Sequence, residues 1–567
     1  MKRLLFLLTM PIAVMSSGIG AQDQTIPNIS FRHSFNVVEA TIPEMQAALE
    51  SGRLTSRELV LLYMSRIAQY EDIVNATAFV SRTALDEAEL MDEERRRGQI
   101  RGPLHGIPIA IKDNINTTNM PTTGGALMLA GFVPKFEAPL VTSLRNAGAI
   151  IIAKTVLTEL ANWVTVGMPN NYSALLGYGM NPYDPRPDPR AGNNDGRAVM
   201  NTGGSSSGIG TAANLWAASV GTETSGSILS PSNQNMLAGI KPTVGLISRH
   251  GVIPITADQD TAGPMARTVT DAAIMLGGMV GFDPNDPITN RCTLPPNRDY
   301  TRHLRRAGLR GARLGIPRAN YYRQTIRPDT GALVGGLNAQ QLALMEEAIQ
   351  ILRNEGAEIV DPADIPSIVD LTPANNFLSF PICGGLANRK GLDSGCSVIL
   401  KYGMKRDFNA WAAASGGPTL TQLRQYNLAN RPRNAIRYEQ EHLDISDEMD
   451  VAGDRARYEA DRAKDLYHSV THGIDETLAV YRLDALVFPG SSSAGIAAKA
   501  GFPTVIVPLG FIPNVPAGAA LPADFNPLPQ PYGIGFTGTA CSEPRLIELA
   551  YAFEQATRRR VPPSSAP

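Results

Sequence analysis

The sequence lacks several features that would place it in other large protein classes. Its 51 basic and 53 acidic side chains leave a formal charge of −2 over 567 residues, which gives no reason to expect nucleic acid as a partner. Beyond the first 21 residues there is no run of about 18 apolar residues, the length a bilayer-spanning helix needs. We therefore expect a soluble chain without membrane attachment, long enough to bury a sizeable core.

Cysteine and histidine are also scarce, and neither forms a recognisable metal site. The four cysteines occur at no spacing typical of metal ligands: Cys292, Cys383, Cys396 and Cys541. Cys383 and Cys396 could bridge a glycine-rich loop or remain free thiols, and the chain is too long to depend on a disulfide framework. His468 and His472 have zinc-like spacing, but no third ligand is evident. A solvated helix face is therefore the better interpretation of this pair.

The first 21 residues have the pattern of an export signal. Lys2 and Arg3 give a positive start, residues 4–14 are mostly apolar, and residues 16–21 are small or polar up to Ala21. The apolar run is too short to span a bilayer. We predict a signal peptide over residues 1–21, cleaved before Gln22, and a periplasmic or secreted mature protein. A buried N-terminal helix is the alternative.

Apolar strands and amphipathic helices alternate along the rest of the chain. Short runs rich in β-branched residues predict buried strands at 107–111, 149–153, 313–316, 358–360, 485–488, 504–509 and 533–537. Helices are expected at 81–97, 138–146, 212–220, 338–355 and 543–557, and Thr55 with Glu58 forms a capping box before another. The alternation predicts an α/β fold with a mixed or parallel sheet covered by helices. Residues 365–482 have fewer strands and predict a helical insertion.

Three short stretches carry the residues best suited to chemistry. Residues 106–114 read Gly-Ile-Pro-Ile-Ala-Ile-Lys-Asp-Asn, an apolar strand that ends on Lys112. Burial lowers the pKa of a lysine amine, so the neutral form can act as a base near pH 7. Residues 203–208 read Gly-Gly-Ser-Ser-Ser-Gly, and residues 221–228 read Gly-Thr-Glu-Thr-Ser-Gly-Ser-Ile. A serine hydroxyl needs a neighbouring base to become a nucleophile. The stretches therefore predict a serine nucleophile that Lys112 activates, with a second serine as proton relay.

The serine stretches also admit other interpretations. The glycine within residues 224–227 allows successive backbone N–H groups to point at one spot, as an oxyanion hole requires. A flexible linker is disfavoured because residues 203–208 lead into an alanine-rich, helix-forming segment. Residues 204–208 match the G-x-S-x-G nucleophile elbow, but no apolar strand precedes them as that motif requires.

Taken together, these stretches resemble the amidase signature family of serine hydrolases. The resemblance extends to residues 239–246, Gly-Ile-Lys-Pro-Thr-Val-Gly-Leu, and to residues 260–267, Asp-Thr-Ala-Gly-Pro-Met-Ala-Arg. It covers roughly residues 40–285 and 484–558. It implies a single large α/β domain over residues 22–567, whose central mixed sheet is covered by helices on both faces. The core would span about 40–360 and 484–558, and the helical insertion about 365–482.

The resemblance also implies a Ser–cis-Ser–Lys triad that needs no metal ion and no cofactor. Ser227 occupies the nucleophile position, Lys112 the base position and Ser205 the bridging position, which a cis peptide bond holds in the family. Ser206 would support the triad by hydrogen bonding. The oxyanion hole would be formed by the backbone of four residues: Thr224, Ser225, Gly226 and Ser227.

Two features depart from the common family pattern. Ser205 and Ser227 lie 22 positions apart, slightly closer than in the family, and the missing residues are expected in the helix after Gly208. A gap elsewhere would let Ser206 or another neighbour take the bridging position. Leu229 stands where many members carry arginine, as in the peptide amidase branch, and an apolar residue there speaks against a carboxylate-bearing substrate.

The predicted activity is hydrolysis of a primary amide, at the C-terminus of a peptide or on a similar acyl amide, through an acyl-enzyme. An aryl-acylamidase or esterase with the same triad is the alternative enzyme. From another class, the chain could be a catalytically silent amidase-fold binding protein. The expected partner is a small-molecule or peptide amide, with the protein a monomer or homodimer.

Overall fold

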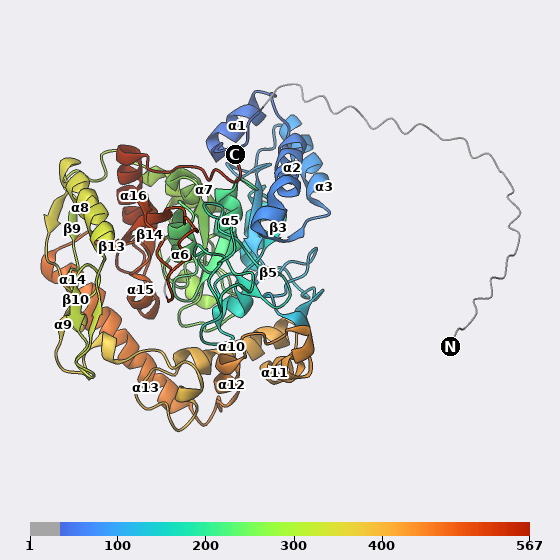
Figure 1. The fold of residues 1–567 in the computed structure, drawn as a ribbon. Helices are drawn as coiled ribbons and strands as arrows, with labels where there is room; N and C mark the ends of the chain where they lie inside the picture. The colour runs from blue at the N-terminus through green and yellow to red at the C-terminus, as the bar shows by residue number, and fades with distance from the viewer. Residues whose placement is uncertain (1–34, 517) are drawn as a thin grey trace, which may run out of the picture. The chain divides into compact units, whose positions relative to one another are not determined.

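The computed structural model describes residues 35–516 and 518–567. The predicted signal peptide, residues 1–21, lies outside these ranges. Figure 1 shows a central sheet with helices packed around it, and a group of helices from the later part of the chain along one side. The predicted α/β class is confirmed.

The central sheet has eleven strands and mixed direction. Neighbouring strands follow the order β1-β3-β2-β6-β8-β7-β14-β15-β13-β9-β12. Strand β2 pairs in parallel with β3 and β6, whereas β6 pairs antiparallel with β8. The strand bounds are β1 Thr77–Val80, β2 Pro108–Lys112, β3 Ile150–Thr155, β6 Ala218–Glu223, β7 Ala238–Lys241, β8 Thr261–Ala266, β9 Arg313–Gly315, β12 Glu358–Val360, β13 Ala485–Pro489, β14 Thr504–Ile512 and β15 Gln530–Thr537.

Helices pack against this sheet and start where the sequence supplies caps. Thr55 and Glu58 form the predicted capping box of α2 (Ser56–Val74), and Asn338 with Gln341 forms another before α8 (Ala339–Asn354). The other helices of this layer are α1 Ile42–Glu50, α3 Ala84–Arg96, α4 Pro139–Asn146, α5 Ser206–Ala212, α6 Leu229–Gln234, α7 Val269–Met279, α15 Ala494–Ala500 and α16 Glu543–Thr557. Apart from α6, these helices contribute apolar residues to one continuous core with the strands.

Residues 365–482, called here the helical segment, lie between β12 and β13. They contain helices α9 Pro366–Val369, α10 Ile399–Ser415, α11 Leu420–Ala429, α12 Glu441–Asp447, α13 Arg455–Leu466 and α14 Asp475–Tyr481, and no strand. In Figure 1, α10, α11, α12 and α13 lie together along the lower side of the molecule. Phe408 and Trp411 of α10 pack with Trp163 in a separate apolar cluster. The predicted helical character is confirmed, while its description as an insertion stays a prediction.

The helix predicted at 212–220 is wrong, because only residue 212 is helical, residues 213–217 form turns and residues 218–220 begin strand β6. Helix α5 comes earlier and ends at Ala212, and Asn214 adopts a left-handed backbone conformation. Alanine favours a helix, but packing overrides this weak preference. Here Trp216 is fully buried and its Nε1 donates to Thr211 Oγ1 at 2.8 Å. The alanine and serine side chains of β6 are small enough to lie buried between β2 and β8.

Two disulfides join the four cysteines. The bridge between Cys383 and Cys396, which the sequence left open, is present, and a second joins Cys292 to Cys541. Nothing in the sequence indicated the second pair, because its cysteines are 249 residues apart. It connects the segment after α7 with the start of α16.

Breaking the longer disulfide is expected to cost more stability than breaking the shorter one. The bridges close loops of 249 and 13 residues, which in the chain-entropy account contribute roughly 5 and 3 kcal/mol. Urea unfolding of Cys292→Ser/Cys541→Ser and of Cys383→Ser/Cys396→Ser, each against the oxidised wild type, measures both losses. An equal or reversed order would contradict this prediction.

Candidate active site

Lys112 is the last residue of β2, and its side chain is fully buried. Its Nζ donates to the carbonyl oxygen of Thr222 at 3.1 Å. Burial lowers the pKa of this amine to about 7, and the negative charges of Glu223 and Asp260 oppose that shift. A neutral amine is therefore available near pH 7.

The other buried lysines show what is unusual about Lys112. Lys154, Lys401 and Lys499 each lie close to an aspartate, at 3.3, 2.6 and 2.6 Å respectively. Lys241 donates to the backbone carbonyl oxygens of residues 497 and 502. Like Lys241, Lys112 has no carboxylate within ion-pair distance in the described chain. Of these five lysines, only Lys112 lies on β2, the strand that pairs with β6, and β6 leads to Ser227. A buried charge without a partner is costly, so the amine is poised to lose its proton.

Ser205 lies at the start of α5, as its N-cap. Its Oγ accepts a hydrogen bond from the backbone N–H of Ser207 at 3.2 Å, and its backbone is extended (φ −158°, ψ 127°). The cis peptide bond expected at Ser205 is not found. The single cis bond in the described chain joins Asp361 and Pro362. An N-cap residue needs β-region dihedral angles for its side chain to reach back to the helix, and Ser205 reaches these angles through trans peptide bonds.

Ser227 follows β6 and lies against the residue that precedes Ser205. A β-carbon built on Gly204 would lie 3.1 Å from Ser227 Oγ. Ser227 is half-buried. No hydrogen bond joins Lys112, Ser205 and Ser227 to one another within the described residues. The structure thus gathers the predicted residues at the carboxyl ends of β2 and β6, while their catalytic roles stay predictions.

The turn at residues 224–227 leaves its backbone donors unpaired. In the described part of the chain, no hydrogen bond uses the N–H group of any of these four residues. Gly226 has a backbone φ of +93°, which residues other than glycine rarely adopt. The carboxylate of Glu223 accepts from the N–H groups of Ile228 and Leu229 at 2.8 and 2.9 Å, which fixes the turn into α6. The free N–H groups suit an oxyanion.

Two supporting residues near these serines were not predicted. Asn171 donates from Nδ2 to Ser206 Oγ at 2.7 Å, and its backbone N–H donates to Thr158 Oγ1 at 2.7 Å. The backbone N–H of Thr158 donates in turn to Gly204 O at 3.4 Å. Both residues lie in loops without a motif, so no local signal in the sequence could have identified them. This hydrogen bond joins the Ser206 side chain to Asn171 and not to Lys112, Ser205 or Ser227, so the support that Ser206 was expected to give the triad stays a prediction.

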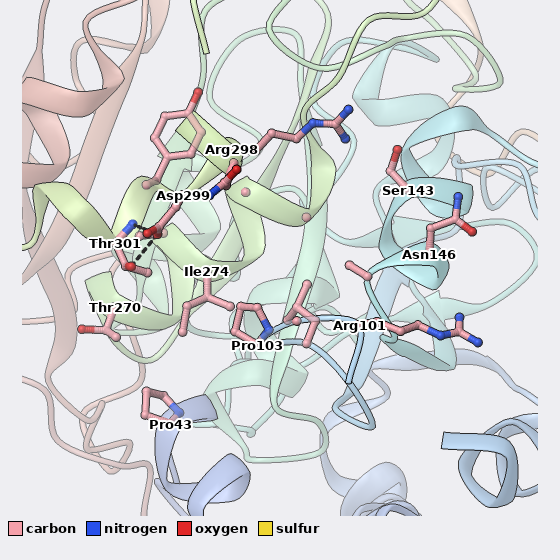
Figure 2. Close-up of a pocket in the computed structure, with 18 residues that line it drawn as sticks. Pro43, Arg101, Pro103, Ser143, Asn146, Thr270, Ile274, Arg298, Asp299 and Thr301 are labelled. Carbon is pink, nitrogen blue, oxygen red and sulfur yellow. Dashed lines mark hydrogen bonds between the residues drawn. The ribbon is translucent and has the colours of Figure 1, made fainter. Parts of the chain in front are cut away.

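A separate cavity of about 790 Å³ lies at the other end of β2. Figure 2 shows it between Ile274 of α7, Ser143 of α4 and the loop that carries Pro103. Residues 103–104 precede β2, whereas Lys112 ends it. The cavity therefore lies at the amino end of β2, and the serines lie at its carboxyl end. Ligands of open α/β sheets bind at the carboxyl ends of the strands, which favours the edge with Lys112 as the active site.

A family model described as Amidase matches residues 58–381, which is more than half of the chain. The chain belongs to the amidase family. It is 34% identical over 558 residues to a probable amidase of Arabidopsis thaliana, covering 97% of this chain and 95% of the relative. This amidase is therefore a hydrolase that acts on amide C–N bonds.

Solved structures support the same assignment. The peptide amidase from Stenotrophomonas maltophilia is 35% identical, with a TM-score of 0.77, and the match covers 94% of this chain and 100% of that one. A peptide amidase in complex with the competitive inhibitor chymostatin is 36% identical, with a TM-score of 0.78 and coverage of 93% and 100%. The predicted family and single-domain fold are confirmed.

Leu229, the residue that departs from the common family pattern, is fully buried in this amidase. Leu229 is the first residue of α6, and none of its side chain is exposed. It offers no charge to a substrate.

Among the described helices, none is both long and apolar enough to cross a bilayer.

Proposed function

We propose that this amidase hydrolyses primary amides at the C-terminus of peptides, with Ser227 as nucleophile, Ser205 as proton relay and Lys112 as base. The proposal rests above all on Lys112, a fully buried amine with a pKa of about 7 and no carboxylate partner in the described chain, beside the strand that leads to Ser227. A lysine in this state can accept a proton at neutral pH, which an exposed lysine cannot.

The hydrogen-bonding capacity of Ser205 fits the relay. One lone pair of its Oγ accepts from the Ser207 N–H, which leaves the hydroxyl proton to be donated to Lys112 and a second lone pair to accept the proton of Ser227. Ser227 Oγ then attacks the amide carbon, and the negative oxygen is stabilised by the N–H groups of residues 224–227. The proton returns through Ser205 to the leaving nitrogen, and ammonia departs. Water, activated by the same relay, hydrolyses the acyl-enzyme.

The substrate class is supported by similarity and by one side chain. The peptide amidase of Stenotrophomonas maltophilia matches over 94% of the chain. An apolar, buried Leu229 offers no partner for a substrate carboxylate. Both observations favour an uncharged C-terminal amide over a free acid.

Ammonia release from amidated dipeptides, measured beside arylamine release from anilides, tests this proposal on residues 22–567. We expect ammonia from the peptide amides and a much smaller rate on anilides. Arylamine release with no ammonia would overturn the substrate class. Inhibition by chymostatin, the competitive inhibitor of the related peptide amidase, gives an independent check of the peptide-binding site.

We further propose that the protein is exported. The signal-like pattern of residues 1–21 supports this, as do the two disulfides, because disulfides persist in oxidising compartments. N-terminal sequencing of the protein from a secretion-competent host should begin at Gln22.

A further inference from the structure

We propose that Gln259 and Asp260 are positioning residues that hold the oxyanion turn in its reactive geometry. This inference rests on the proposed function, since it presumes that the N–H groups of residues 224–227 bind the oxyanion. Gln259 and Asp260 lie just before β8 and are both buried. Neither needs to touch the substrate, because both act through Thr224.

Gln259 fixes the orientation of one peptide group in the turn. Its Nε2 donates to the carbonyl oxygen of Thr224 at 3.2 Å. The Thr224 carbonyl and the Ser225 N–H belong to the same planar trans peptide and point in opposite directions. By holding the carbonyl, Gln259 therefore aims the Ser225 N–H away from the buried loop.

The peptide between Gly226 and Ser227 is held in the same way, through its carbonyl group. The N–H of Ser230 donates to the carbonyl oxygen of Gly226 at 2.6 Å, which aims the N–H of Ser227. Two of the proposed oxyanion donors are thus oriented through the carbonyl groups of their own peptides. The first depends on the Gln259 side chain, so mutation can remove it without altering the turn sequence.

Asp260 holds the side chain of the same threonine. Its Oδ1 accepts from Thr224 Oγ1 at 2.5 Å, and its Oδ2 accepts from the N–H groups of Ile255 and Thr256 at 2.8 and 3.0 Å. The carboxylate therefore connects Thr224 to the backbone of residues 255–256. Thr224 is held at its carbonyl by one residue and at its hydroxyl by the next.

The helical segment also contacts the loop that carries Gln259 and Asp260. The carboxylate of Asp258 accepts from the hydroxyl of Tyr458 on α13 at 2.8 and 2.9 Å, and Arg406 of α10 donates to it at 3.3 Å. The N–H of Ala257 donates to Asp407 on α10 at 2.7 Å. Residues 256–260 thus link α10 and α13 to the oxyanion turn, residues 224–227. Through this link the helical segment helps to position the turn without contacting the substrate.

Replacing Gln259 by leucine separates positioning from simple structural support. The Gln259 Oε1 is buried and has no hydrogen-bond partner in the described chain, so leucine removes one unsatisfied group. It also leaves the Thr224 carbonyl without its donor, and these two effects on stability oppose each other. We expect Gln259→Leu to lower kcat by about 10- to 100-fold, as loss of alignment at a reacting centre does, with KM changed less than about threefold and the protein still folded at the assay temperature.

Two further variants complete the test. Asp260→Asn can still bond Thr224 and the backbone at 255–256, so it should retain more kcat than Asp260→Ala. Asn427→Leu is the matched control: this buried amide also has an unpartnered oxygen, and it contacts Gln440 rather than the turn. We expect its kcat to equal that of the wild type.

The outcomes distinguish this inference from the proposed function. Wild-type kcat in Gln259→Leu, with Ser227→Ala inactive, would overturn the positioning role and leave the nucleophile assignment intact. Activity in Ser227→Ala would overturn both. A fall in kcat matched by an equal loss in Asn427→Leu, or explained by a lower melting temperature, would also contradict the positioning role.

Discussion

Ser227→Ala is expected to lower kcat for amide hydrolysis by roughly 10⁴- to 10⁶-fold, as nucleophile removal does in serine hydrolases. The Ser227 side chain is half-buried and makes no hydrogen bond in the described structure, so the substitution should leave the melting temperature within about 2 °C of wild type. Steady-state ammonia release and thermal unfolding, measured on the same preparation, check both parts.

Covalent labelling gives a second measurement of the same prediction. A serine-directed phosphonate should modify wild-type protein at Ser227, as located by peptide mass analysis, and should fail to modify Ser227→Ala. Ser492→Ala is the control, because Ser492 is an exposed serine in the loop before α15, whose Ala494 faces Gly226. Full activity in Ser227→Ala, or inactivity in Ser492→Ala, would refute the assignment.

Lys112→Met is expected to abolish activity and at the same time to stabilise the protein. Loss of a general base costs at least about 10²- to 10⁴-fold, and methionine nearly matches the length of lysine without its amine. The Lys112 pKa falls from its ordinary value of 10.5 to about 7 on burial, and each pKa unit corresponds to about 1.4 kcal/mol. Removing the amine should therefore raise the free energy of unfolding at pH 7 by up to about 4 kcal/mol.

The pH dependence of that gain has a definite sign. Below pH 7 the lysine is protonated in both states, so the burial penalty is fully present. Between pH 7 and 10.5 only the unfolded chain binds the proton, so wild-type stability rises with pH and the advantage of Lys112→Met fades. Denaturant unfolding of both proteins at pH 6, 8 and 10 measures the difference. A difference that grows with pH would contradict a lowered pKa for Lys112.

The same pKa predicts the acid limb of the rate profile. Activity requires the neutral amine, so kcat/KM should rise with pH through a pKa near 7. Lys112→Arg, which stays protonated, should be inactive at every pH.

The sequence predicted best those elements in which local and tertiary preferences agree. The α16 helix has the expected bounds, Glu543–Thr557, because its apolar stripe, proline and acidic first turn all favour a helix at the same place. Strand β2 ends on Lys112 as expected, because a short apolar run with three isoleucines favours a buried strand. The stretches that contain Lys112, Ser205 and Ser227 were likewise identified from their amino-acid sequences and their order along the chain.

Other features depend on packing between distant segments, and local sequence does not encode that. Strand β6 follows an alanine-rich stretch that favours a helix, and it forms because β2 and β8 flank it. Strand β8 contains a glycine and a proline, which local sequence does not associate with a strand. The disulfide of Cys292 joins segments 249 residues apart. Gln259 contacts Thr224 across 35 positions, and nothing in its neighbours marks that contact.

The buried lysines shield half of this protein's lysine side chains from amine-reactive reagents. Of its ten lysines, five are almost fully enclosed: Lys112, Lys154, Lys241, Lys401 and Lys499. An acylating reagent applied to the folded protein can reach only the remainder, and each additional label acquired in denaturant or heat reports the opening of a particular part of the core. Lys401 lies in the helical segment and Lys154 in the sheet, so the order in which these two become labelled would show which of the two opens first.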